Sequence, residues 1–136
     1  MKKLFVDTSA WVAVVNRRDQ YHNMASTFYK NAFQEYGQLI TTNLVAAETY
    51  ILLRLDCGLD VALGWWERIT TSLKVKMIYA DADITWEAVK FLRKFDDQAF
   101  SLTDAVSFAV MQQVKVNEAF AFDDHFVVAG FTMLPY

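Results

Sequence analysis

Short segments rich in apolar and β-branched residues alternate along this chain with longer segments of helical periodicity. The short segments lie at residues 3–6, 39–42, 75–79 and 118–122, with a weaker one at 132–135. Apolar runs of this length, bounded by turn and capping residues, are typical of buried strands. Strands that alternate with helices are expected to run parallel, with helices on both faces of the sheet. The pattern predicts an α/β fold, a three-layer α/β/α sandwich with a mainly parallel sheet of four to five strands.

The helical segments fill most of the chain between these strands. We expect helices over about residues 10–16, 22–35, 43–58, 60–72, 81–94 and 101–114. With 136 residues, of which 54% are hydrophobic and 15% aromatic, the chain is long and apolar enough for one buried core. No linker, repeat or low-complexity segment divides it, so residues 1–136 are expected to form a single domain.

Charge and cysteine content limit the possible functions. The net charge is −3 and the 13 Lys and Arg residues are scattered, so net charge alone would not hold a nucleic acid. The single cysteine, Cys57, leaves no internal disulfide and no cysteine cluster for zinc. Two lysines precede the first apolar run as in a signal peptide, but Asp7 interrupts that run. No segment reaches the length of a membrane span, so we expect a cytoplasmic protein without a membrane partner.

Four acidic residues fall where the predicted fold would bring them to one edge of the sheet. Asp7 and Asp123 directly follow predicted strands, while Glu48 and Asp104 lie in the first or second turn of predicted helices. Ligands of such folds bind at the carboxyl ends of the strands, and the helices that follow those ends begin on the same side. Each acid also has an ordinary interpretation as a turn, a helix cap or part of a polar helix face. His22 and His125, taken singly, are typical of structural or surface residues.

Convergence of these carboxylates would favour a bound cation. Clustered carboxylates repel one another and raise their own pKa values unless a cation lies between them. A set of oxygen ligands suits Mg²⁺ or Mn²⁺ better than zinc or copper. A metal ion bridging protein and phosphate would also explain how an acidic protein binds a nucleic acid.

Four motifs, in this order, resemble those of the PIN-domain ribonucleases, and within them the VapC-like toxins of toxin–antitoxin pairs. The motifs are FVDTSAWVAVVNRRDQYH (5–22), NLVAAETY (43–50), FSLTDAVSFAVM (100–111) and AFAFDDHFVVAGF (119–131). Each motif alone is a weak signal, whereas all four at family-like spacing over almost the whole chain are specific. The resemblance implies a PIN-like fold.

The resemblance also implies roles for particular residues. The metal ligands and catalytic residues would be Asp7, Glu48, Asp104 and Asp123, with Ser9 placing Asp7 through a hydrogen bond. The chain departs from the family pattern in having Ala121 where Thr or Ser is common. It also has Ala99 where an acid is common, which leaves Asp97 as an accessory acid.

The function implied by the resemblance is Mg²⁺- or Mn²⁺-dependent hydrolysis of RNA phosphodiester bonds. A VapC-like toxin would also have a small antitoxin as partner and would form a homodimer. A housekeeping PIN-domain nuclease of RNA processing or quality control is the alternative on the same fold. A non-catalytic RNA-binding module is a further alternative, against which the four acids count because a binder of RNA gains nothing from clustered negative charge.

Overall fold

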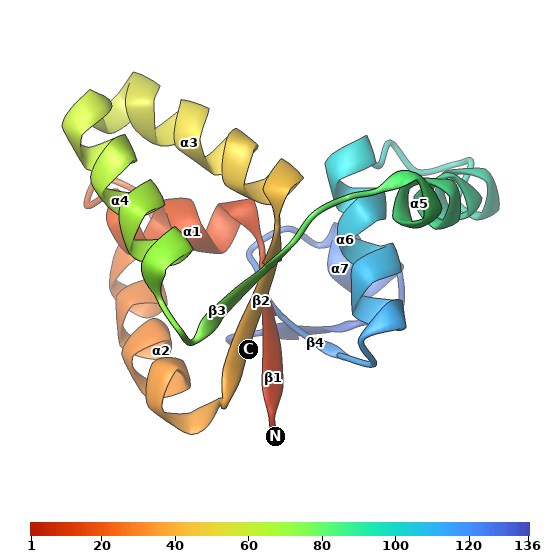
Figure 1. Ribbon diagram of the computed structural model, residues 1–136, viewed down its shortest axis with the longest axis horizontal. Coiled ribbons are helices and arrows are strands. Elements are labelled where there is room, and N and C mark those ends of the chain that lie inside the picture. The colour runs from red at the N-terminus through yellow and green to blue at the C-terminus, as the bar shows by residue number, and fades with distance from the viewer.

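Five parallel strands form one sheet at the centre of the computed structural model, which describes residues 1–136 (Figure 1). The strand order is β3-β2-β1-β4-β5, and every neighbouring pair is parallel. The strands are β1 (Lys3–Val6), β2 (Gln38–Thr42), β3 (Val75–Ile78), β4 (Glu118–Phe120) and β5 (Thr132–Leu134). The predicted α/β fold is thus confirmed, and the weak C-terminal segment is a paired edge strand.

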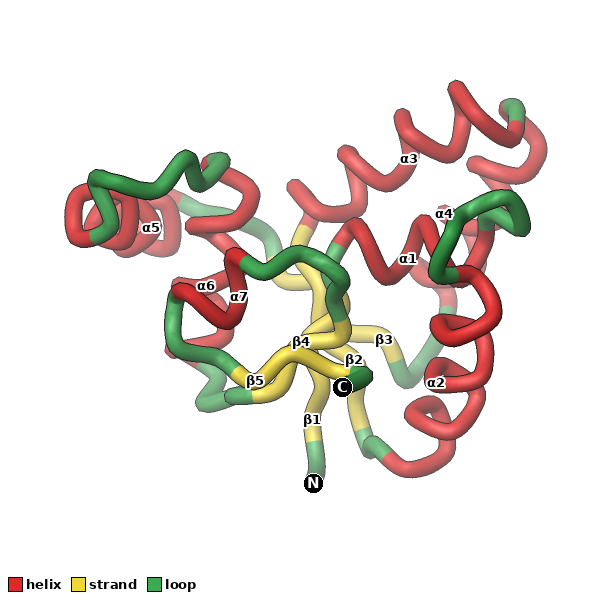
Figure 2. The backbone as a smooth tube through the Cα atoms, turned by 180° about the vertical axis from the view of Figure 1, so that it is seen from behind, coloured by secondary structure: helices red, strands yellow, loops and turns green.

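The helices gather on the two sides of this sheet, as the front and rear views show (Figures 1 and 2). One group comprises α1 (Thr8–Val15), α2 (His22–Glu35), α3 (Asn43–Cys57) and α4 (Leu59–Thr71). The other group comprises α5 (Ala82–Lys94), α6 (Leu102–Gln113) and the short α7 (His125–Val128). The sequence did not predict α7, because four residues are too few to show helical periodicity.

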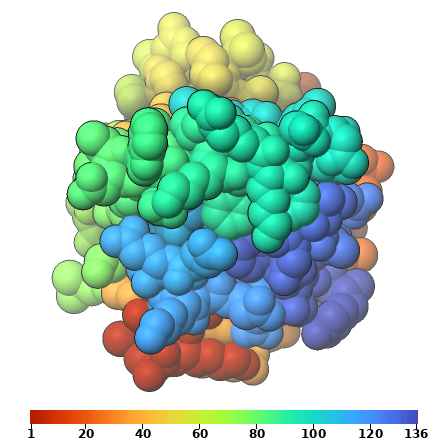
Figure 3. Space-filling view, turned by 90° about the vertical axis from the view of Figure 1, so that its right-hand side faces the viewer, coloured from red at the N-terminus to blue at the C-terminus, as the bar shows by residue number.

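Helix α6 is the buried helix of the second group and carries the acidic residue Asp104 in its first turn. All eight residues from Asp104 to Met111 are buried, so the helix is enclosed on all its faces. Phe108 packs against Phe126 and Phe100, with ring centroids 5.1 Å apart in both pairs. From the side, α5 and its flanking loops form a band across the outside of the molecule above the C-terminal residues (Figure 3). No helix has the combination of length and hydropathy needed to cross a lipid bilayer.

The chain order reverses at β1, which lies between β2 and β4. From β1 the chain moves outward to β2 and β3, and it later returns to the other side of β1 to form β4 and β5. Val6 and Phe120 are paired in register, and the backbone N–H of Asp7 donates to the carbonyl of Phe120 at 3.0 Å. The carboxyl ends of β1 and β4 therefore lie side by side at a topological switch point, where open α/β sheets bind ligands.

Candidate metal centre

Asp7 is the first acid at this switch point and is almost completely buried, with 4% of its surface exposed. It is the N-cap of α1, and its Oδ2 accepts hydrogen bonds from the Ser9 hydroxyl at 2.9 Å and the Ser9 N–H at 3.4 Å. Burial, with a smaller effect from the charge of Asp104, raises the pKa of Asp7 from 3.8 to about 7, although the hydrogen bonds from Ser9 and Thr8 oppose this rise. A nearby cation would stabilise the ionised form of such a carboxyl and lower its pKa.

Ser9 ties Asp7 to the strand that carries the next acid. Its hydroxyl donates to Oδ2 of Asp7 and accepts the backbone N–H of Phe122, both at 2.9 Å. Phe122 immediately precedes Asp123, so one hydroxyl fixes the relative position of two acid-bearing segments. Ala121, which replaces the Thr or Ser of the family pattern, has a fully buried side chain, and its N–H pairs with the carbonyl of Leu134.

Asp104 enters the site from the first turn of α6, where a capping box holds it. The Ser101 hydroxyl accepts the Asp104 N–H at 3.0 Å, and Oδ2 of Asp104 accepts the Ser101 N–H at 3.2 Å. Each side chain satisfies a backbone donor that a helix start leaves free. Oδ2 of Asp104 also accepts a hydrogen bond from Nδ1 of His125 at 2.9 Å.

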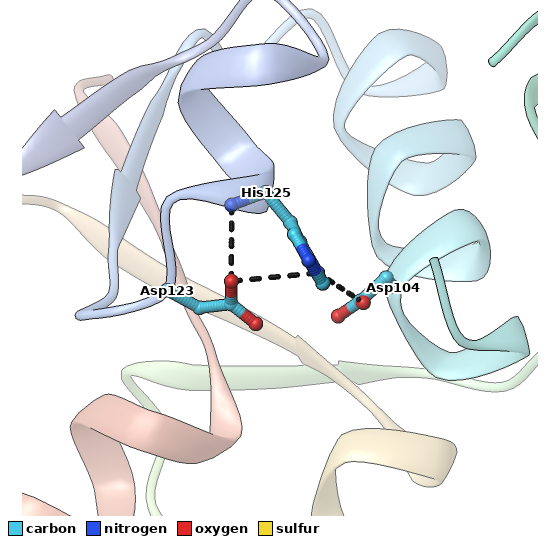
Figure 4. Close-up of side chains that lie close together, drawn as sticks. All are labelled: Asp104, Asp123 and His125. Atoms are coloured by element: carbon cyan, nitrogen blue, oxygen red, sulfur yellow. Dashed lines mark hydrogen bonds and ion pairs between the residues drawn. The ribbon is translucent and has the colours of Figure 1, made fainter. Parts of the chain in front are cut away.

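Asp123 and His125 complete a group of three with Asp104 (Figure 4). Oδ1 of Asp123 accepts the backbone N–H of His125 at 3.0 Å and lies 3.4 Å from Nδ1 of the same residue. One potential ligand atom from each of the three residues lies within 4.8 Å of the others. The hydrogen bond to Asp104 and the charges of Asp123, Asp104 and Asp7 raise the pKa of His125, although burial opposes them. Its protonated form therefore offsets part of the negative charge.

Besides Asp7, two further predicted acids, Glu48 and Asp97, lie outside this group. Glu48 is exposed on the second turn of α3, the helix that begins at the carboxyl end of β2. Asp97 is exposed in the loop between α5 and α6. Neither belongs to the group of three potential ligands, so their roles stay predictions.

His125 is the residue that the sequence did not assign to the site. Taken alone it is typical of a structural or exposed residue, yet it contacts two acids from different segments. The sequence did contain a signal for this residue, because His125 follows Asp123 by two residues and therefore lies near the same strand end. Its contact with Asp104 joins residues 21 positions apart, which only the packing of α6 against α7 reveals.

The donor set fits a divalent cation. Asp7, Asp104 and Asp123 offer carboxylate oxygens, and Oδ1 of Asp104 and Oδ2 of Asp123 accept no hydrogen bond from the protein. Hard oxygen ligands with free lone pairs suit Mg²⁺ and Mn²⁺, and the neighbouring imidazole is also an acceptable ligand for Mn²⁺. Asp104 is buried and Asp123 is half-buried, and both lie near Asp7. A bound cation would balance the negative charge of these three acids, which otherwise face only His125.

The fold thus places a buried acid at a switch point, beside two further acids on converging segments. Comparison with known proteins gives the family. The PIN domain family model matches residues 4–131, and the chain belongs to this family. The 23S rRNA-specific endonuclease VapC20 of Mycobacterium tuberculosis, from strains CDC 1551 and H37Rv, is 35% identical over 128 residues. The match covers 94% of this chain and 95% of VapC20.

Solved structures give the same result for the fold. The crystal structure of Mycobacterium tuberculosis VapC20, described as a sarcin–ricin loop cleaving toxin, superposes with a TM-score of 0.87 at 34% identity. That match covers 95% of this chain and 96% of VapC20. VapBC2 from Rickettsia felis, bound to a DNA fragment from its promoter, gives a TM-score of 0.71 at 9% identity. FitAcB from Neisseria gonorrhoeae gives 0.66 at 13%, and these two show similarity of fold alone.

Proposed function

We propose that this protein is a metal-dependent ribonuclease that hydrolyses RNA phosphodiester bonds, and that it is the toxin of a toxin–antitoxin pair. The observation that carries the proposal is the position of Asp7 at the sheet edge where Asp104 and Asp123 both contact His125. VapC20, 35% identical over nearly its whole length, is a 23S rRNA-specific endonuclease. RNA of the ribosome is therefore the substrate class to test first.

Each residue has a defined part in this proposal. Asp7, Asp104 and Asp123 would hold Mg²⁺ or Mn²⁺, and the bound ion would supply polarisation of the scissile phosphate and a more acidic water. Ser9 orients Asp7 through its hydroxyl, and Ser101 orients Asp104 through the capping box. His125 donates to Asp104 and, when protonated, would reduce the repulsion between Asp104 and Asp123. We propose that Glu48 completes the metal site and that Asp97 acts as an accessory acid.

Metal removal provides the direct test of the proposed reaction. The substrate is an RNA hairpin that copies the sarcin–ricin loop, with total cellular RNA as a second substrate. We expect cleavage with Mg²⁺ or Mn²⁺, none in EDTA, and recovery when either metal is returned in excess. Mapping of the product ends identifies the bond that is cut. Cleavage that continues undiminished in EDTA, after exhaustive dialysis, would refute the metal-dependent mechanism.

Expression in a bacterial host separates a toxin from a housekeeping nuclease. A toxin should arrest growth on induction, and a small protein encoded beside it should relieve the arrest. A host that grows normally while the purified protein cleaves RNA would favour the RNA-processing alternative. Binding of RNA without cleavage under any metal condition would favour the non-catalytic module.

An apolar groove beside the first helix group is the proposed antitoxin site. Its volume is about 550 Å³, and it lies between α1, α2, α4 and β3. Trp11, Tyr29 and Trp65 line it with aromatic surface, while Arg68 and Lys30 bring positive charge. The indole N–H of Trp65 is buried without a hydrogen-bond partner. Such a surface suits an amphipathic helix with acidic flanking residues.

Phe33 lines the groove and is 39% exposed, so a substitution there leaves the core intact. We expect Phe33→Glu to weaken antitoxin binding at least about tenfold, because a charge would be buried against apolar side chains. The matched control is Phe33→Leu, and isothermal titration with the neighbouring gene product measures both. Equal affinity of the two variants would place the antitoxin elsewhere.

The homodimer stays a prediction, which sedimentation equilibrium of the isolated protein checks.

A further inference from the structure

A pair of aromatic rings stands next to the acidic site and has no part in the chemistry described above. The rings of Tyr21 and Phe122 are stacked face to face, with centroids 4.5 Å apart and planes within 1° of parallel. Tyr21 comes from the loop between α1 and α2, whereas Phe122 directly precedes Asp123. Segments 101 residues apart in the chain (122 minus 21) thus meet in a two-ring stack at the edge of the site.

Phe122 is held on both its backbone and its ring. Its N–H donates to the Ser9 hydroxyl that also holds Asp7. Its ring packs edge-on against Phe120, with centroids 6.0 Å apart, and Phe120 in turn packs on Phe28 at 4.7 Å. The stack is therefore anchored in the core and has a fixed position relative to the acids.

Tyr21 is also held in place, yet it remains accessible. Its backbone N–H donates to Oδ1 of Asp19 at 2.9 Å, and its carbonyl accepts the N–H of Ala25 at 2.8 Å. Earlier in the same loop, Oδ1 of Asn16 accepts the N–H of Arg18. Although Phe122 covers one ring face, 38% of the Tyr21 surface is exposed. A half-exposed aromatic ring on an ordered loop is a flat surface available to a ligand.

The roles proposed above for the surrounding residues do not require this arrangement. A loop needs no exposed aromatic side chain to reach α2, and a tyrosine at 38% exposure contributes only part of its surface to the core. RNA loops, by contrast, present unstacked bases, and proteins bind such bases by stacking them on aromatic side chains.

We propose that Tyr21 binds one nucleobase of the RNA by stacking, next to the phosphate that is cut. The proposal rests on the proposed ribonuclease function and extends it to substrate recognition. The base would add a third ring to the Tyr21–Phe122 stack and fix the register of the strand over Asp7, Asp104 and Asp123. Tyr21 is thus a positioning residue, and it selects an unpaired base over a base held in a duplex.

The test compares three variants, Tyr21→Phe, Tyr21→Leu and Tyr21→Gln, on the sarcin–ricin hairpin. Tyr21→Phe keeps the ring and serves as the matched control. Loss of stacking on one base is expected to weaken binding by roughly 5- to 150-fold. We expect the Leu and Gln variants to show this rise in Kd by fluorescence anisotropy with Ca²⁺ in place of Mg²⁺, so that a divalent ion still bridges the acids and the phosphate. With Mg²⁺ present they should show it in KM, with a much smaller change in kcat. Thermal unfolding confirms that each variant is folded.

Hairpins with a single abasic nucleotide, scanned along the loop, separate stacking from a structural role. On one abasic hairpin the wild type should bind as weakly as Tyr21→Leu, and the substitution should have no further effect there. A loss that persists on every abasic hairpin, or equal affinity of the Leu and Phe variants for the intact hairpin, would overturn the stacking proposal. Absence of metal-dependent cleavage by the wild type would overturn the ribonuclease function alone, since binding with Ca²⁺ is measured separately.

Discussion

Asp7→Asn should reduce metal-dependent RNA cleavage at least about 100-fold while the protein remains folded. Asparagine is nearly isosteric and can still accept the hydrogen bonds that Ser9 donates to position 7. It lacks the negative charge, however, and a neutral amide oxygen binds Mg²⁺ far more weakly than a carboxylate does. Initial rates on the sarcin–ricin hairpin, measured over a range of Mn²⁺ concentrations, give the loss and its dependence on metal.

The control for this substitution is Asp96→Asn, which removes the same charge from an exposed position in the loop after α5. We expect this variant to cleave within about twofold of the wild type, because exposed charges are largely screened. Cleavage by Asp7→Asn at more than a tenth of the wild-type rate would exclude Asp7 as an essential metal ligand.

Asp7→Asn should also make the protein in EDTA more stable than the wild type at alkaline pH. The pKa of Asp7 in the folded protein is about 7, against an ordinary value of 3.8. The folded protein therefore holds this proton more tightly than the unfolded chain does. Its stabilising effect is complete below about pH 4 and is lost as the pH rises through 7. Since an asparagine side chain does not titrate, the Asp7→Asn variant should gain relative to the wild type over this range, by roughly 2–4 kcal/mol.

Urea unfolding in EDTA at pH 5 and pH 8 measures this difference. The change between the two pH values is the informative quantity, because any effect of the asparagine on packing is the same at both. Asp96→Asn is again the control and should show no comparable change with pH. A constant difference between Asp7→Asn and wild type from pH 5 to pH 8 would mean that folding does not raise the pKa of Asp7. Together with the loss of cleavage, a gain in stability would show that the site gives up folding free energy for metal binding.

The sequence was sufficient to predict the sheet, because its strands are short and mostly apolar or β-branched. Leu4, Phe5 and Val6 are all fully buried, as the pattern of β1 indicated. Details that depend on long-range contacts were not predictable. Asparagine is a common N-cap residue, yet Thr42 and not Asn43 caps α3. The side chain of Asn43 instead accepts the N–H of Ala80, 37 residues away.

The acidic site shows the same division between local and long-range information. Asp7, Asp104 and Asp123 were predicted because each stands at a strand end or in a first helical turn, positions that the local pattern reveals. His125 was missed because its importance comes from contact with Asp104, which the sequence places 21 residues away. The exposure of Glu48 could not be read from the sequence either, since it depends on how α3 leaves the sheet.

Anomalous diffraction from crystals soaked in Mn²⁺ tests most directly whether the acids at this edge hold a metal ion. We expect a strong anomalous peak in contact with the carboxylates of Asp7, Asp104 and Asp123, and no such peak in crystals of Asp7→Asn soaked in the same way. If wild-type crystals contain no peak at this position, although the same protein cleaves RNA with Mn²⁺ in solution, the metal centre proposed for this edge of the sheet is wrong.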